Sequence, residues 1–336
     1  MKKRRALIVG AGHWSRAWGE TLKRSDGAEI VGWVDIRQDA ALEAAQQLGL
    51  PALYTGTDLE EAIATTRPDF VVNVTVPSAH CDVAIQALEA GLPVLCEKPM
   101  ADTMEQARAM VDASERTGKL LMVSQQRTRD PGFAAMRRLI LEHIGPLGIL
   151  NSDFYRSHPE PQFHLGMSSP LLLDMAIHTF DAARYLAGAD PVAVYCEDFN
   201  PPWSWHTGKS CAVAIFEMTG GLRYTYRGSW CSYGKATTWE SEWRAVGPNG
   251  TVTWTDATAP EAEIVVESGA FPARTRRIVG EPRSDLPTGL AGSLHDFLSS
   301  LETGATPMGE CHDNIKSLAM VLGALESAAS GRRVHL

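Results

Sequence analysis

The 336-residue sequence predicts an α/β protein in two parts, a parallel sheet covered by helices and then an α+β region. Between residues 5 and 123, short strands alternate with amphipathic helices, and these strands are apolar at successive positions. Strands of this kind are buried on both faces of a parallel sheet. From about 190 to 280, β-branched and aromatic runs are separated by glycine and asparagine turns, which is typical of antiparallel strands.

Five strands are expected in the first part, each a short apolar run. They lie at Ala6–Val9, Glu29–Asp35, Phe70–Val74, Val94–Cys96 and Leu120–Val123. The helices expected between them lie near 14–24, 38–48, 58–66, 78–90 and 103–117. Glycine and proline residues, such as those in Gly91-Leu92-Pro93, separate these elements.

The pattern changes after about residue 125, so we expect one domain over residues 1–126 and a second over 127–336. In the second domain a strand is expected near 147–157 and hairpin turns at Gly220-Gly221 and Pro248-Asn249-Gly250. The helices expected there lie near 131–143, 170–187, 290–302 and 311–329.

Composition excludes several classes of partner. The formal net charge of −9 argues against a nucleic-acid surface, which needs a basic stripe. No run approaches the ~18 apolar residues of a membrane helix. The apolar stretch after the basic run Lys2–Arg5 is too short for a secretory signal. Six scattered cysteines without metal-ligand spacing indicate buried, reduced thiols. We therefore expect a cytoplasmic protein without nucleic-acid or membrane partners.

A glycine turn follows the first strand, in the segment Gly10-Ala11-Gly12-His13-Trp14-Ser15. Gly10 and Gly12 allow a tight turn and the close approach of a pyrophosphate, and the helix that follows offers its N–H groups and dipole. Ser15 stands where the third glycine of the G-x-G-x-x-G pattern is usual. Asp35 ends the second strand, where an acid bonds a ribose 2′-hydroxyl. The pattern indicates a Rossmann domain; the alternative is a plain strand–helix turn with a surface aspartate.

The acid at position 35 bears on the choice of dinucleotide. Asp35 would repel a 2′-phosphate and therefore favours NAD. Arg37, two residues further on, could instead pair with that phosphate, so NADP stays possible.

A second motif, Glu97-Lys98-Pro99, directly follows the apolar run that ends at Cys96. A strand that ends in this way delivers Lys98 to the carboxyl edge of the sheet, where open α/β sheets bind ligands. We expect Lys98 to lie beside the reactive ring of a nicotinamide.

The helix expected from Pro170 is apolar nearly all round and should be buried, yet it carries Asp174, His178 and Asp181 on one face. Because buried ionisable groups are costly, this strip needs an explanation. Asp174 and His178 are interpreted as catalytic, whereas Asp181 is interpreted as part of a core network with Arg184. A metal bound by the first pair is a weaker alternative, since no third ligand is evident.

These residue types suit the oxidation of an alcohol, in which hydride goes to nicotinamide and the hydroxyl loses its proton. His178 is a natural general base near neutral pH. Lys98 can donate a hydrogen bond to the developing alkoxide. Asp174 would orient the imidazole or offset the lysine charge. The residues leave open whether Lys98 or His178 takes the proton.

Over essentially its whole length the sequence resembles the Gfo/Idh/MocA family, which takes its name from glucose-fructose oxidoreductase, inositol dehydrogenase and a rhizopine-catabolism protein. The matching features are the glycine turn, Asp35, Pro77-Ser78-Ala79-His80, Ala87–Gly91 leading into Glu97-Lys98-Pro99, and the Asp174, His178, Asp181 spacing. Met167-Ser168-Ser169-Pro170 departs from the glycines that many members carry there, so the substrate is left open.

The resemblance implies a Rossmann domain followed by an α/β domain with a large open sheet that often forms dimers. It also implies NAD(P)-dependent oxidation of a hydroxyl on a sugar, polyol or sugar derivative, with Lys98, Asp174 and His178 as the catalytic trio. We accordingly expect a homodimer or homotetramer built through the C-terminal sheet. The alternatives are an NAD-dependent glycosidase that uses transient oxidation and a non-catalytic NAD-binding regulator.

Contacts to the cofactor and the substrate are expected at the sheet edge and on the following strands. The cofactor set is Gly10, Gly12, His13, Trp14, Asp35, Arg37, Thr75, Pro77, His80, Glu97, Lys98 and Gln126. The substrate set is Lys98, Arg127, Tyr155, His158, His164, Asp174, His178 and Trp230, with Arg156 as a further candidate. The aromatic group around Trp230 could equally form a sheet core or an oligomer interface.

Overall fold

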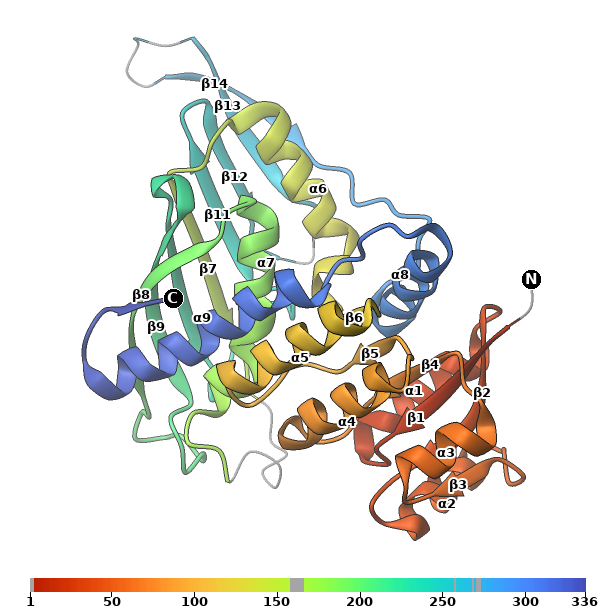
Figure 1. Ribbon diagram of the computed structural model, residues 1–336. Helices are drawn as coiled ribbons and strands as arrows, with labels where there is room; N and C mark the ends of the chain where they lie inside the picture. Colours follow the sequence, from red (N-terminus) through yellow and green to blue (C-terminus); the bar gives the residue numbers. More distant parts are fainter. Residues whose placement is uncertain (1–2, 158–165, 257, 268, 270–272) are drawn as a thin grey trace. The chain divides into compact units, whose positions relative to one another are not determined.

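The computed structural model describes residues 3–157, 166–256, 258–267, 269 and 273–336 (Figure 1). The chain divides into two compact units, one of Met1–Gln126 with Leu286–Leu318 and one of Arg127–Asp285 with Ala319–Leu336. The first break follows residue 126, where the sequence pattern changes. The segment Leu286–Leu318 belongs to the first unit, although the sequence-based division had assigned it to the second.

The first unit holds a six-stranded parallel sheet in the order β3-β2-β1-β4-β5-β6. Its strands are β1 (Arg4–Val9), β2 (Ala28–Val34), β3 (Tyr54–Gly56), β4 (Phe70–Asn73), β5 (Val94–Cys96) and β6 (Leu121–Val123). Its helices are α1 (His13–Arg24), α2 (Gln38–Gln47), α3 (Leu59–Thr66), α4 (Pro77–Glu89), α5 (Met104–Thr117) and α8 (Gly289–Thr303). The expected strands are all present, and β3, only three residues long, is an addition.

Apolar packing explains why α8 belongs with the first sheet. Leu294 and Phe297 of α8 are buried in one core cluster with Trp18 of α1 and Phe70 of β4. The rings of Phe70 and Phe297 have centroids 5.3 Å apart. Because the strand pattern shows that the sheet needs cover but not which helix supplies it, this late segment could not be assigned from its sequence alone.

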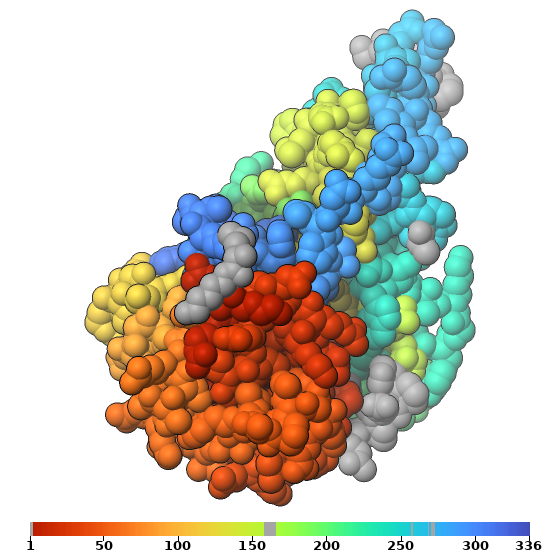
Figure 2. Space-filling view, turned by 90° about the vertical axis from the view of Figure 1, so that its right-hand side faces the viewer, coloured from red at the N-terminus to blue at the C-terminus, as the bar shows by residue number. Residues whose placement is uncertain are grey.

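The second unit holds a nine-stranded sheet in the order β14-β13-β12-β11-β7-β10-β9-β8-β15. The strands are β7 (Ile149–Tyr155), β8 (Pro191–Phe199), β9 (Cys211–Met218), β10 (Arg223–Ser229), β11 (Glu242–Gly247), β12 (Gly250–Trp254), β13 (Glu261–Glu267), β14 (Arg274–Val279) and β15 (Val334–His335). β7 and β10 pair in parallel, and the other neighbours pair antiparallel. Figure 2 shows β13 and β14, in light blue, projecting from this unit.

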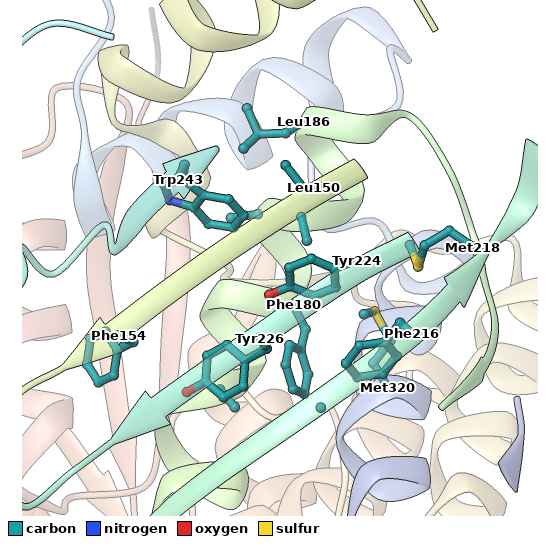
Figure 3. Close-up of a cluster of buried hydrophobic side chains, with 14 of the residues drawn as sticks. Leu150, Phe154, Phe180, Leu186, Phe216, Met218, Tyr224, Tyr226, Trp243 and Met320 are labelled. Atoms are coloured by element: carbon teal, nitrogen blue, oxygen red, sulfur yellow. The ribbon is translucent and has the colours of Figure 1, made fainter. Parts of the chain in front are cut away.

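Helices cover one face of this sheet (Figure 1). They are the short η1 (Arg127–Arg129), α6 (Pro131–Leu139), η2 (Ile140–Ile144), η3 (Leu171–Ala176), α7 (Ile177–Ala187) and the later part of α9 (Cys311–Ser330). At the centre of the core, Phe180 of α7 meets Phe216 and Tyr226 edge-on, with centroids 4.8 and 5.1 Å away (Figure 3). This packing holds the helix that carries the predicted acid and imidazole.

All six cysteines are buried, and none forms a disulfide. Among the residues described, no helix is long and apolar enough to cross a membrane.

An imidazole links two elements of the first unit. His312, in the first turn of α9, has Nδ1 2.7 Å from Oε1 of Glu310 and Nε2 2.9 Å from Oε1 of Glu115 on α5. These two carboxylates raise the pKa of His312 above its usual 6.5. Only the protonated ring donates from both nitrogens, so the doubly bonded arrangement needs the charged form.

This link should make stability depend on pH. Because the folded pKa is raised, the stabilisation is complete below pH 6.5 and is lost as pH rises through the folded value. The side chain is half exposed, so we expect less than about 1 kcal/mol. Urea unfolding at pH 6 and pH 8.5 measures it: the wild type should lose more stability than His312→Gln between these values. Equal losses in the two proteins would contradict the assignment.

Candidate active site

The glycine turn between β1 and α1 is held by close backbone packing. Gly10 has a φ of 102°, and a Cβ there would lie 2.5 Å from the carbonyl oxygen of Val74. No other residue therefore fits this position. A Cβ built on Gly12 would meet nothing within 4 Å, so the space in front of the helix N-terminus is open. A pyrophosphate needs this combination of a tight turn and an open approach to N–H groups.

Ser15 explains the departure from the third glycine. Its side chain is fully buried, and its hydroxyl donates to the carbonyl of Gly12 at 2.6 Å. The serine closes the turn with its own side chain, so the substitution preserves the turn. His13 and Trp14 beside it are exposed.

Asp35 lies just after β2 and also supports the turn. Its Oδ2 accepts from the amide of Ala11 at 2.7 Å, and its Oδ1 accepts from the amide of Arg37 at 2.9 Å. The guanidinium of Arg37 is mostly exposed, with Nε 4.0 Å from Oδ1. Each carboxylate oxygen keeps a second lone pair for a ribose hydroxyl, which fits NAD.

Lys98 follows β5 at the carboxyl edge, as the sequence predicts, and is partly exposed. Glu97 before it is buried, and its Oε1 accepts from the indole Nε1 of Trp18 at 2.7 Å. Its Oε2 accepts from the amide of Lys98 at 3.1 Å. Burial raises the pKa of Glu97, and the bond from Trp18 and the charge of Lys98 oppose that rise. The carboxylate thus anchors the segment that presents the lysine.

His80 supports the same segment from α4. It is buried, with Nδ1 2.7 Å from the carbonyl oxygen of Pro99 and Nε2 3.1 Å from that of Thr75. Burial lowers its pKa. The predictions placed His80 and Glu97 in contact with the cofactor. Their buried polar atoms are bonded to protein groups, which gives both residues a positioning role, and their contact with the cofactor stays a prediction.

Asn73 is a site residue that the sequence analysis missed. It is fully buried at the end of β4, where its Nδ2 donates to the carbonyl of His80 at 3.0 Å and its Oδ1 accepts from the hydroxyl of Thr75 at 2.7 Å. The signal that the sequence offered was a polar residue at the end of an otherwise apolar strand. Thr75, Pro77 and Gln126 are partly exposed, so they stay candidates for cofactor contact.

In the second unit the predicted catalytic residues lie on η3 and α7. The sequence predicts one regular helix from Pro170, but its first turns are a π-helix that includes Asp174, and the α-helix begins at Ile177. π-turns occur frequently at functional sites. His178 and Asp181 are buried, and Asp174 is partly exposed. Arg184 forms an ion pair with Asp190, its Nη2 lying 3.2 Å from Oδ1.

The strands place the residues that were predicted to contact the substrate in different surroundings. Phe154 and Trp230 are buried and stacked, with centroids 5.7 Å apart, so Trp230 backs the site from the core and is not a surface that a sugar could contact. Tyr155 alternates with Phe154 and so faces the side of the sheet that carries Asp153. Direct substrate contact by Trp230 and Tyr155 stays a prediction, which this packing does not support. His158 and His164 lie outside the described residues.

Arg127, by contrast, lies close to Asp174 of η3. Burial lowers its pKa to about 10, while the charges of Glu240 and Asp174 oppose that fall. Its Nη1 donates to the carbonyl of Trp239 at 2.7 Å. Trp239, a member of the aromatic group around Trp230, lies in a loop before β11 and is exposed.

Comparison with known proteins identifies the family. Residues 4–125 match the model of the oxidoreductase family with an NAD-binding Rossmann fold, and residues 133–253 match the GFO/IDH/MocA C-terminal domain.

The chain belongs to the Gfo/Idh/MocA family.

Relatives and solved structures agree with this assignment. The chain is 26% identical to D-apiose dehydrogenase of Paraburkholderia graminis over all of this chain and 90% of that protein. It is 31% identical to inositol 2-dehydrogenase of an Arthrobacter species, over 56% of each chain. An Agrobacterium radiobacter oxidoreductase in complex with NAD⁺, L-tartaric acid and magnesium has the same fold, with a TM-score of 0.86, 21% identity and coverage of 99% of this chain and 98% of that one.

The predicted family, fold class, enzyme class and cofactor are thereby confirmed. The protein is an NAD-dependent oxidoreductase with a Rossmann sheet and a second, mixed sheet. Gly10, Gly12 and Asp35 are the residues whose geometry fits NAD.

The cofactor preference should depend on the charge at position 35. Asp35→Asn keeps an acceptor for the turn but removes the negative charge that repels a 2′-phosphate, and Arg37 is then available to it. We expect the ratio of NAD to NADP affinity to fall about tenfold, measured as dissociation constants by fluorescence. Asp39→Asn, in the first turn of α2, is the control. An unchanged ratio in Asp35→Asn would contradict the role of this charge.

Proposed function

We propose that the protein oxidises a hydroxyl group of a sugar, a polyol or a sugar derivative. The observation that carries the proposal is the retention of a complete set of groups for this reaction. The set is the open glycine turn, the anchored Lys98 segment at the sheet edge, and the acid and imidazole on η3 and α7. The names of two relatives, D-apiose dehydrogenase and inositol 2-dehydrogenase, support a sugar or polyol substrate.

Each residue has a defined task in this proposal. NAD, held by the glycine turn and Asp35, would supply the hydride acceptor. The ammonium of Lys98 donates a hydrogen bond to the substrate oxygen and stabilises its developing negative charge. His178 or Lys98 takes the hydroxyl proton, and Asp174 offsets the positive charge that then builds up. His80 and Glu97 fix the position of Lys98 through Pro99 and the lysine amide.

The general test is NADH formation across monosaccharides, inositols and anhydrosugars, together with analysis of the sugar product. A dehydrogenase gives one oxidised product for each NADH. Glycosides belong in the same panel, because release of free sugar without net NADH would indicate transient oxidation and contradict the proposal.

Loss of the lysine should abolish turnover without loss of NAD. We expect Lys98→Ala to lower kcat at least about 100-fold, because the alkoxide loses its charged donor. The dissociation constant for NAD, measured by calorimetry, should change much less, because the turn and Asp35 are intact. Lys119→Ala, at the opposite end of the same sheet, is the control. Near-normal kcat in Lys98→Ala would remove the catalytic assignment.

We also propose that the chain forms a homodimer or homotetramer through the helix-free face of the second sheet. Tyr195, Val213 and Ile215 are 39–48% exposed on this face, on the neighbouring strands β8 and β9. Arg227 of β10 makes a bidentate bond with Asp153 of β7 beside them. An apolar patch bordered by charges of both signs can complement a second copy of itself.

A charge in the middle of the apolar patch should disrupt this assembly. Ile215→Glu places a carboxylate next to Tyr195, its cross-strand partner, where a second copy would bury it. Sedimentation velocity should show an oligomer for the wild type and a monomer for the variant. Leu141→Glu, an exposed position in η2 on the opposite face, is the control. A wild-type monomer would contradict the proposal.

A further inference from the structure

Two guanidinium groups of the second unit contact one indole ring. The Cζ of Arg156 lies 4.1 Å from the centroid of Trp239, and the Cζ of Arg127 lies 5.3 Å from the same ring. Arg127 also lies 5.7 Å from the ring of Phe154. These distances are within cation–π range, so the aromatic rings hold both cations in place.

The two arginines use few of their donors on the protein. Arg127 donates from Nη1 to the carbonyl of Trp239 at 2.7 Å, and Arg156 donates from Nη1 to the carbonyl of Thr237 at 2.6 Å. Each guanidinium carries five N–H groups, so most of their hydrogen-bonding capacity is available to a ligand.

The positive charges of Arg127 and Arg156 lie close together. Burial and the neighbouring charge of Arg156 both lower the pKa of Arg127, which reaches about 10 in spite of Glu240, Asp174 and Tyr226. When burial disfavours the charged form of an arginine, a negatively charged group that binds beside it stabilises that form. The Arg127 guanidinium therefore gains from an added negative charge, beyond the part that Glu240 and Asp174 already compensate.

The position of the two arginines places their positive charge on the side of the site where the substrate is proposed to bind. Arg127 interacts electrostatically with Asp174, the acid of the proposed catalytic set. Arg156 also lines a hollow of about 510 Å³, whose wall includes Lys235, the hydroxyl residues Thr237 and Thr238, and the carboxylates of Glu242 and Asp256. A group that enters this hollow thus meets two cations and hydroxyl donors beside these two carboxylates.

We infer that Arg127 and Arg156, held against Trp239, bind an oxyanion group of the substrate, a carboxylate or a phosphate carried on the sugar. The inference rests on the proposed function, since it identifies the substrate class of the same site. The planar guanidinium matches both kinds of oxyanion with two parallel hydrogen bonds. A purely structural role, pinning residues 237–239 through their carbonyls, is the alternative that an experiment must separate.

The experiment compares a neutral hexose with its uronic acid and its 6-phosphate, as substrates with NAD and as ligands of the NAD-loaded enzyme by calorimetry. We expect one acidic member to exceed the neutral sugar in kcat/KM by at least about tenfold. Which member does so separates carboxylate from phosphate. The KM of that member should rise with ionic strength, whereas the KM of the neutral sugar should not.

Variants separate recognition from structure. Arg156→Gln keeps a donor for the Thr237 carbonyl but loses the charge, and Arg156→Lys keeps the charge but loses the fork. For the acidic substrate, Arg156→Gln should raise KM about ten- to hundredfold, with a smaller rise for Arg156→Lys. KM for the neutral sugar should change less than about threefold. Arg276→Gln, an exposed arginine on β14, is the control.

The outcomes distinguish this inference from the proposed function. Turnover of neutral sugars with no preference for acids, or equal losses on both substrates in Arg156→Gln, overturns the anion site and leaves the dehydrogenase. Absence of turnover with arginine-dependent binding of the acid supports the site and overturns the dehydrogenase. Absence of acid binding by the NAD-loaded enzyme overturns the site whatever the turnover.

Discussion

The contact between Gly10 and the Val74–Thr75 backbone is the constraint on which the nucleotide half of the site depends. β1 and β4 are neighbours in the sheet, and the strand order reverses at this pair. The amide of Val74 donates to the carbonyl of Val9 at 2.8 Å, so the two strands stay paired to their last residues. A side chain at position 10 would separate them, because its Cβ would lie 2.5 Å from the Val74 carbonyl oxygen. The absence of one side chain thus keeps the carboxyl ends of β1 and β4 together, where ligands bind.

From this junction a chain of buried polar contacts leads to the lysine. Asn73 bonds Thr75 and the carbonyl of His80, and the His80 ring bonds the carbonyl of Pro99. On the other side, Glu97 receives the indole N–H of Trp18 and the amide of Lys98. Unpaired, these groups would be costly to bury, so their mutual satisfaction stabilises one arrangement of the edge. The fold therefore determines the position of Lys98. Few rearrangements of this sheet edge would leave the buried polar groups around Lys98 hydrogen-bonded.

The sequence predicts best what depends on local pattern. Uniformly apolar runs identified five strands of the first sheet, and the glycine turn and Glu97-Lys98-Pro99 located the nucleotide edge. The prediction failed where a contact between segments far apart in the sequence determines the position of a residue. Segment Leu286–Leu318 covers the first sheet because of Phe297, and Trp230 is buried by stacking on Phe154.

The groups proposed for hydride transfer and the groups proposed to bind an anion differ in the same way. The groups proposed for hydride transfer came from short motifs, whereas Arg127, Arg156 and Trp239 converge from η1, the end of β7 and a loop before β11. A net charge of −9 gives the protein as a whole a field that opposes anions. At physiological salt, however, charges more than ~8 Å apart are largely screened. The charges that a ligand meets there are therefore local ones, and two guanidinium groups on one ring offer an acidic substrate paired donors even in an acidic protein.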